Sequence, residues 1–208
     1  MYMKKVILGL IIIFLINDLY TQEYEDYYTR VARHIDWTNP NENYGMIFKI
    51  GDLIYLREWG IYHIPNDTEK RNLAYFADRV SHVISFYKYN NLTPIVISSW
   101  IRPTSVNAGK LNSLGRIVKD PSNKYNGMDY NAFVGGKAGS LHITGLAVDI
   151  IDTGTRPLTN FILSRQDILE SCQLWMEDET SATTWVHLDA GERSSVGRPK
   201  GRERVFKP

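Results

Sequence analysis

Two histidines and one aspartate have the residue types and the spacing to bind a metal ion. His142 and Asp149 are seven positions apart, and His187 follows in a later segment. Gly145 would let the backbone double back after His142, and the β-branched residues near it favour a turn that feeds a strand. On that strand Asp149 would share a face with Ala147, whose small side chain leaves room for an ion. Two imidazoles and one carboxylate suit zinc, with a fourth position left for water.

Composition excludes other kinds of metal site and some classes of partner. The chain has 208 residues and a single cysteine, Cys172, so neither an internal disulfide nor a cysteine-rich zinc site can form. Its 24 Lys and Arg residues nearly balance 23 Asp and Glu residues, for a formal net charge of +1. We therefore expect no nucleic-acid partner, because no overall field attracts a polyanion. The remaining histidines, interpreted as surface or packing residues, are His34, His63 and His82.

One long helix is predicted from its cap and its periodicity. Asn66 with Glu69 three residues later has the pattern of an N-cap and capping box. Apolar residues then recur at helical spacing from Leu73 to Tyr87, which predicts one buried face. The pair Asn90-Asn91 would end this helix.

Strands are predicted around the candidate metal ligands. Runs rich in β-branched or alternating residues predict strands over 94–100, 146–151 and 183–189, and short strands or an irregular arm over 46–64. Ser164 with Asp167 predicts the cap of a further helix. A helix followed by separated strands favours a small α+β domain, and the length favours one such domain.

The first 22 residues differ from the rest of the chain. Lys4 and Lys5 precede eleven uninterrupted apolar residues over 6–16, a length that fits the apolar region of a signal peptide (about 7–15) and not a membrane span of about 20. Residues 1–22 are therefore predicted to be a signal peptide or, because no small-residue cleavage site follows, an uncleaved signal anchor. An amphipathic or buried N-terminal helix is the alternative.

Two further segments flank the expected domain. Residues 23–65 read as an N-terminal lead-in. Residues 192–208 form a basic tail with six Lys or Arg residues against two Glu, which is either merely solvated or weakly attracted to anionic polymers.

Several blocks, taken in order, resemble the zinc D-alanyl-D-alanine carboxypeptidase family. That family shares its fold and metal site with other murein peptidases and with the Hedgehog signalling domain. The resemblance spans roughly residues 73–191, and the ending Val186-His187-Leu188-Asp189-Ala190-Gly191 is most similar to the murein endopeptidase branch. The blocks that carry it are Ile97-Ser98-Ser99-Trp100-Ile101-Arg102-Pro103, Asn107, Gly135-Gly136, Ser140-x-His142-x-x-Gly145-x-Ala147-x-Asp149 and Trp185-Val186-His187.

The resemblance implies a fold and roles for individual residues. It implies a small antiparallel sheet with flanking helices and the zinc site on the sheet, in a domain over 66–191. His142, Asp149 and His187 match the residues that bind zinc. Arg102 matches the arginine that contacts substrate beside the scissile carbonyl, and Ser140 is expected to support substrate or to hydrogen-bond near a zinc ligand.

One departure concerns the general base. Carboxypeptidase members carry a catalytic Glu or Asp three residues before the last histidine, where this chain has Thr184. The endopeptidase-like branch also lacks an acid there. Asp189 is the local candidate, because positions i and i+2 of a strand share a face with His187; orienting a ligand or capping the next turn is its alternative role. Glu179 and Asp178 are further candidates for the base.

A second departure is the length of one connection. Between Asn107 and Gly135 the chain has 27 residues where relatives are usually short, so 108–134 is predicted to be an inserted loop. Such long loops are functional lids or are disordered. In the first case Tyr125, Tyr130 and Phe133 would pack over a peptide.

These features predict an exported zinc peptidase. We expect it to hydrolyse peptidoglycan stem peptides or crosslinks, at a D,D or an L,D bond, as a monomer in the periplasm or cell envelope that meets a membrane only through its N-terminal segment. A catalytically silent zinc domain that binds wall peptides or a protein partner is the competing class, and a phage lysin with the same chemistry is a further alternative.

Overall fold

A five-stranded sheet and one long helix organise the chain. The computed structural model describes residues 27–90, 94–104, 130–191 and 204–206; the predicted signal segment 1–22, most of the inserted loop and most of the basic tail lie outside these ranges. The strand order in the sheet is β5-β6-β8-β7-β9, in which β9 alone is parallel to its neighbour. The bounds are β5 (Ile97–Ser99), β6 (Ala147–Ile151), β7 (Trp175–Glu177), β8 (Trp185–Asp189) and β9 (Val205–Phe206).

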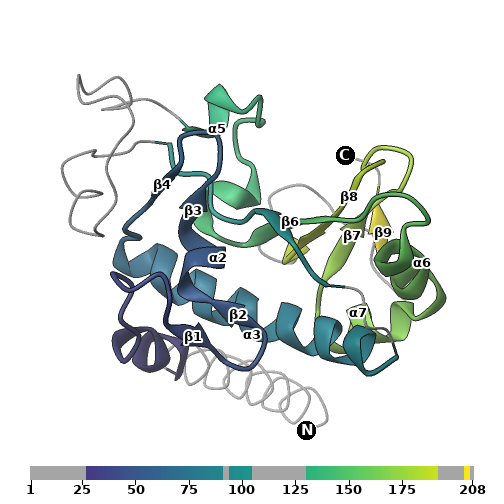
Figure 1. Cartoon of the computed structure of the whole chain (residues 1–208), viewed down its shortest axis with the longest axis horizontal. Coiled ribbons are helices and arrows are strands. Elements are labelled where there is room, and N and C mark those ends of the chain that lie inside the picture. Colours follow the sequence, from purple (N-terminus) through teal and green to yellow (C-terminus); the bar gives the residue numbers. More distant parts are fainter. Residues whose placement is uncertain (1–26, 91–93, 105–129, 192–203, 207–208) are drawn as a thin grey trace, which may run out of the picture.

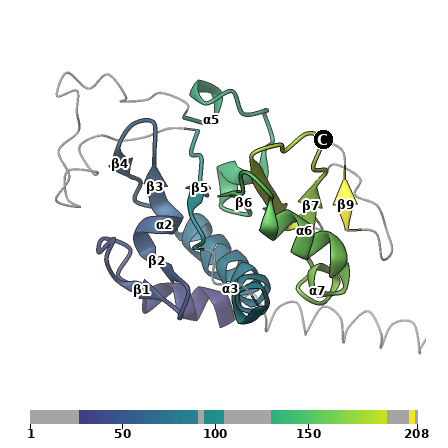
Figure 2. The ribbon, with the colours of Figure 1, turned by 45° about the vertical axis from the view of Figure 1, so that its right-hand side comes forward.

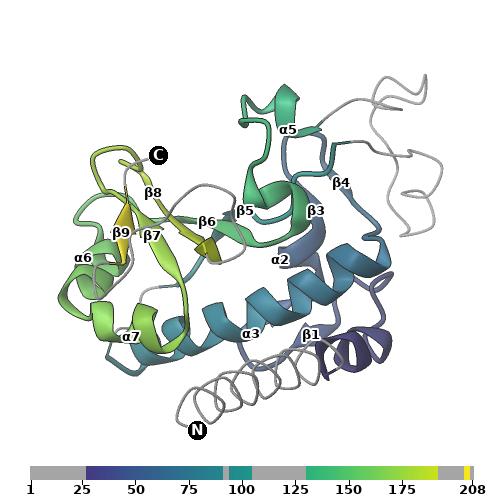
Figure 3. The same ribbon diagram turned by 180° about the vertical axis from the view of Figure 1, so that it is seen from behind.

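Helix α3 (Asp67–Asn90) runs along the molecule, with the sheet near one of its ends and the N-terminal elements around the other (Figures 1 and 3). Its predicted capping box is confirmed: the Glu69 N–H donates to Asn66 Oδ1 over 3.0 Å, and the Asn66 N–H donates to Glu69 Oε2 over 2.7 Å. Its apolar face is buried as predicted, from Leu73 to Tyr87. The sheet and the N-terminal elements therefore both pack against α3.

The N-terminal lead-in, described from residue 27 to residue 65, consists of short elements that pack around the first half of α3. A helix over 27–33 precedes two small antiparallel pairs, and these account for the short strands predicted over 46–64. Its buried side chains belong to the same hydrophobic cluster as those of the sheet and α3. The elements are β1 (Asn43–Tyr44), β2 (Phe48–Lys49), α2 (Ile50–Ile54), β3 (Tyr55–Leu56) and β4 (Ile61–Tyr62).

Two short helices follow β6 in the chain. The sequence predicts one helix there, capped by Ser164. The two helices are α6 (Pro157–Ser164) and α7 (Gln166–Ser171). The expected cap is wrong: Ser164 ends α6 and its hydroxyl donates to the Phe161 carbonyl over 2.8 Å. Pro157 instead starts α6, because its fixed φ and missing N–H suit a first helical position.

The described part of the chain is an α+β fold, as the sequence predicted. The sheet is antiparallel except for β9, a strand that the sequence analysis did not anticipate. Among the described residues, no helix has both the length and the apolar character of a membrane span.

Candidate metal centre

Strand register aligns the candidate ligands across the sheet. Asp149 on β6 pairs with Ser99 on one side and with His187 of β8 on the other. Cross-strand partners point to the same face, with Cβ atoms about 4.5–5.5 Å apart. The pairing therefore brings Asp149 and His187 together although 37 residues separate them in the sequence.

His142 comes from a short 3₁₀ helix, η2 (Leu141–Thr144), that enters β6. Ser140 caps this helix, and its hydroxyl accepts the His142 N–H over 3.4 Å. Gly145 ends it in the left-handed region at φ 77°, which is accessible to glycine without strain. The ring Nδ1 lies 2.6 Å from the Trp100 carbonyl; since a carbonyl only accepts, Nδ1 carries the proton and Nε2 keeps its lone pair.

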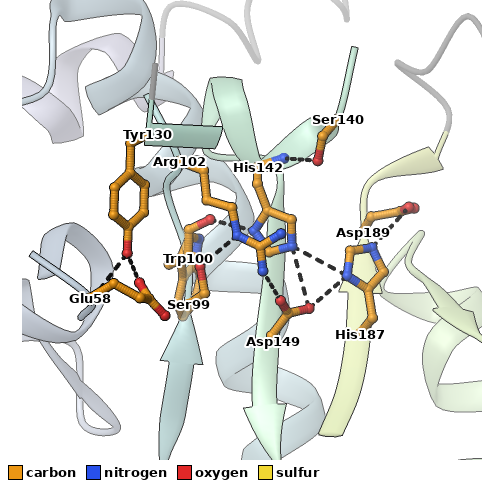
Figure 4. Close-up of polar contacts among 10 residues, drawn as sticks. All are labelled: Glu58, Ser99, Trp100, Arg102, Tyr130, Ser140, His142, Asp149, His187 and Asp189. Atoms are coloured by element: carbon orange, nitrogen blue, oxygen red, sulfur yellow. Dashed lines mark hydrogen bonds and ion pairs between the residues drawn. The ribbon is translucent and has the colours of Figure 1, made fainter. Parts of the chain in front are cut away.

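The three ligand atoms converge on one point (Figure 4). His142 Nε2 lies 3.3 Å from Asp149 Oδ1 and 3.3 Å from His187 Nδ1, and the last two atoms are 2.8 Å apart. Zinc bonds of about 2.0–2.2 Å in a tetrahedron separate neighbouring ligand atoms by roughly 3.3–3.5 Å. The cluster is slightly tighter than that and all but closed to solvent, with His142 1% and Asp149 7% exposed. These residues could hold a metal ion, as predicted.

The protonation states of His142 and Asp149 suit a metal, whereas His187 would have to lose a proton. Burial lowers the pKa of His142 below its usual value, so this ring is neutral at neutral pH. Burial alone would raise the pKa of Asp149, but its interactions with His142 and His187 hold that pKa below its usual range. Burial alone would lower the pKa of His187, but hydrogen bonds to Asp149 and Asp189 raise it to about 9. Without metal, the proton on His187 therefore supplies positive charge beside Asp149.

Arg102 occupies the other side of Asp149. Its Nε donates to Ser99 Oγ over 2.9 Å, and its Nη2 donates to Asp149 Oδ2. The Arg102 backbone N–H also donates to the His142 carbonyl over 2.8 Å. The guanidinium therefore leaves Asp149 Oδ1 to the metal cluster.

Asp189 lies at the opposite edge of the His187 ring from the metal cluster. Its Oδ2 is 3.5 Å from His187 Nε2, whereas Nδ1 faces Asp149. Asp189 shares a sheet face with His187, as expected from the i, i+2 spacing. The side chain is 1% exposed. This position is that of a carboxylate that orients a histidine ligand.

A pocket of about 800 Å³ opens over the cluster. Its wall includes Glu177 of β7, a residue that no sequence pattern singled out. The two other candidates for the base, Asp178 and Glu179, are not among the described residues that line the pocket. Asp178 instead accepts the Thr180 N–H over 2.9 Å in a turn. The polar, charged and aromatic residues that line it include Arg102, Lys137, Ser140, His142, Asp149, Glu177, Trp185, His187, Asp189 and Phe206.

Glu177 faces this pocket because of its place on β7. Trp175 pairs with Asp189 on the site's face of the sheet, and Glu177 is two positions further along β7, hence on the same face. Its side chain is half-buried, and burial raises the pKa of Glu177. This alternation would have identified the residue had β7 been predicted.

Of the three aromatic residues expected to cover a peptide, Tyr130 has a different role. Tyr130 starts α5 (Tyr130–Phe133) and is 2% exposed, with its ring 4.7 Å from that of Trp59 and its hydroxyl donating to Glu58. It is therefore a core residue, and the expectation that it packs over a peptide is wrong. Phe133 is 51% exposed, and Tyr125 lies outside the described residues.

Comparison with known proteins gives no match. No protein-family model, no curated protein and no solved structure matches this chain. The assignment of function therefore depends on the residues of the site and on their geometry.

Proposed function

We propose that this protein is a zinc-dependent peptidase that hydrolyses peptidoglycan stem peptides or crosslinks. The observation that carries the proposal is the convergence of His142 Nε2, Asp149 Oδ1 and His187 Nδ1 at the base of a pocket that also contains Arg102 and a separate carboxylate. The resemblance of the ordered sequence blocks to zinc murein peptidases supports the substrate class. Export to the periplasm or cell envelope, through residues 1–22, belongs to the same proposal.

The donor set supports zinc over the hard divalent cations. Two imidazole nitrogens with one carboxylate suit zinc once His187 has lost its proton, whereas calcium and magnesium prefer oxygen ligands. Bound zinc would supply Lewis-acid polarisation of the scissile carbonyl and activation of a water molecule. His142 and His187 would each bind through the nitrogen that faces Asp149.

The chain's own residues would bind, orient and move a proton. Arg102, held beside Asp149, would stabilise the developing oxyanion or bind a substrate carboxylate. Ser140, whose hydroxyl contacts the His142 N–H, would hold the loop that carries the first ligand.

We assign the two pocket carboxylates different roles. Asp189 contacts the far nitrogen of His187, so it would keep that ring oriented and its other nitrogen directed at the metal. Glu177 lines the pocket without belonging to the cluster, and burial raises its pKa toward the range useful for proton transfer. Glu177 would therefore accept the proton of the attacking water and pass it to the leaving amine.

Metal analysis and a digestion assay test the proposal. Wild-type protein should contain about one zinc per chain, and His142→Ala should contain close to none, because a three-ligand site loses a ligand. Purified muropeptides should be cleaved by the zinc form and left intact after chelation. Equal metal content in the two proteins would refute the ligand assignment.

Thr184 favours a second candidate, a silent zinc domain that binds wall peptides or a protein partner. Thr184 stands where carboxypeptidases carry an acid, and it cannot serve as a base near neutral pH. A zinc-loaded wild type that binds muropeptides and cleaves none of them would establish this alternative.

A further inference from the structure

Strand β9 brings a distant segment to the edge of the sheet. Val205 pairs with Met176 and Phe206 pairs with Glu177, in parallel register (Figure 2). Two backbone hydrogen bonds fix the pairing: the Met176 N–H donates to the Arg204 carbonyl over 2.8 Å, and the Asp178 N–H donates to the Phe206 carbonyl over 2.7 Å. β9 is therefore held by the strand that carries Glu177.

Side chains of neighbouring elements also anchor β9. The Arg204 guanidinium lies 4.2 Å above the Trp175 ring centre, and the Arg204 N–H donates to Gln166 Oε1 of α7 over 3.3 Å. Val205 is half-buried and packs against the hydrophobic core. Since side chains alternate along a strand, Phe206 points to the opposite face from Val205, where the pocket lies.

Phe206 forms an apolar wall of the pocket. It lines the pocket together with Glu177 and His187, and it is 8% exposed. Its ring meets the His187 ring edge to face, with centroids 6.3 Å apart and planes at 80°. Trp185, two residues before His187 and hence on its face of β8, lines the same pocket.

The pocket has the Arg102 guanidinium at one side and the Phe206 ring, with Glu177 beside it, at the other. Arg102 follows β5 at one edge of the sheet, and β9 is the opposite edge. Lys137 also lines the pocket. A peptide lying across the metal cluster would therefore have one flanking residue near Arg102 and the other near Phe206.

We propose that Phe206 and Trp185 form a subsite for an apolar side chain of the peptide, at the residue on the side of the scissile bond away from Arg102. This inference rests on the proposed peptidase function. Burying an aliphatic side chain against aromatic rings is favourable. An anionic side chain would instead lose its hydration beside the Glu177 carboxylate, whose residue pairs with Phe206. β9 is accordingly part of the substrate-binding site.

The test compares Phe206→Ala and Phe206→Leu with Val205→Ala, which removes apolar contacts of the same strand on its other face. Substrates are synthetic stem-peptide analogues with glycine, leucine or glutamate at either residue flanking the scissile bond. We expect Phe206→Ala to lower kcat/KM for leucine at one flanking position by roughly 10–100-fold, mainly through KM. The glycine analogue should change by less than about threefold. Phe206→Leu should have a smaller effect, and Val205→Ala should match wild type.

Distinct outcomes separate this inference from the proposed function. A uniform loss for all peptides, or equal losses in Phe206→Ala and Val205→Ala, would overturn the subsite, since either result reports only the attachment of β9. Normal selectivity in Phe206→Ala would overturn it as well. If wild type cleaves no peptide, the peptidase proposal fails, and calorimetric binding of the same peptides to zinc-loaded wild type and Phe206→Ala still tests the subsite.

Discussion

His187 has a carboxylate at each ring nitrogen. Asp149 lies 2.8 Å from Nδ1 and Asp189 lies 3.5 Å from Nε2. The ring is therefore protonated near neutral pH when no metal is bound, and the proposed zinc ion would have to displace that proton from Nδ1. Metal binding and proton binding compete for the same atom.

The raised pKa of His187 predicts how the stability of the metal-free protein depends on pH. The folded-state pKa of His187 is raised to about 9, from an ordinary value of 6.5. The proton therefore stabilises the fold fully below about pH 6.5, and this contribution is lost as pH rises through about 9. Urea unfolding of chelator-treated protein should give a free energy of unfolding that falls across this window. His187→Gln should flatten the dependence, and a rise in the wild type would contradict the assignment.

The two pocket carboxylates are separable by substitution. Glu177→Gln should retain zinc and lower kcat by roughly 10²–10⁴-fold, because it removes the proton acceptor. Asp189→Asn should weaken zinc affinity or activity by roughly 10–100-fold, because His187 loses its orienting partner. Zinc titration and muropeptide kinetics measure both. Full activity in Glu177→Gln, together with a loss of kcat at normal zinc affinity in Asp189→Asn, would return the base to Asp189.

At the scale of elements, the turn between η2 and β6 depends on Gly145. Its φ is +77°, and an added Cβ would lie 2.9 Å from the Leu73 side chain of α3. Gly145→Ala should therefore lower stability by more than the strain alone, which is about 1–3 kcal/mol for such a backbone. Gly154→Ala is the matched control, because Gly154 has φ +67° with no atom within 4 Å of the added Cβ. Equal losses in thermal or urea unfolding would exclude the contact with Leu73.

The elements that could be predicted are those with local signals. The capping box of α3 and the strands around Asp149 and His187 each have a signature in neighbouring residues, and the metal ligands follow from them. Helix α6 does not, because its first N–H groups are capped from outside: Asp152 accepts from the Leu158 and Thr159 N–H groups over 3.2 and 2.8 Å. Such a cap is formed by the tertiary fold.

Glu177 and Phe206 were missed for a similar reason. Strand β7 has three residues, Trp-Met-Glu, and β9 has two, which is too short for alternation to be recognised in the sequence. Only the pairing of β7 with both β8 and β9 defines these strands. The candidate metal ligands could be predicted from the sequence, whereas the far wall of their pocket depends on contacts between distant segments.

At the scale of the whole molecule, residues of the lead-in contact the segments that hold Arg102 in the site. Arg57 Nη2 donates to the Ile97 carbonyl of β5 over 2.9 Å, and Trp59 packs against Tyr130. The Tyr130 N–H in turn donates over 3.1 Å to the carbonyl of Pro103, the residue after Arg102. The turn between β3 and β4 thus contacts segments on both sides of Arg102.

This packing predicts that a substitution far from the metal ligands is costly. Trp59 is 1% exposed, so Trp59→Ala should lower the free energy of unfolding by about 3–5 kcal/mol. Met46→Ala is the control in the same lead-in, since Met46 is 98% exposed and its replacement should stay within about 0.5 kcal/mol. Urea denaturation measures both, and a Trp59→Ala protein as stable as wild type would show that the lead-in is dispensable.

The pairing of β9 with β7 also bears on how the protein behaves at high concentration. A sheet edge with unpaired N–H and C=O groups is a template for strands of other molecules. β9 covers the edge of β7, where the Met176 and Asp178 N–H groups are bonded to it, and Arg57 binds one carbonyl of β5 at the opposite edge. Detaching β9 would therefore uncover a strand able to pair between chains, and such a protein should aggregate before it unfolds.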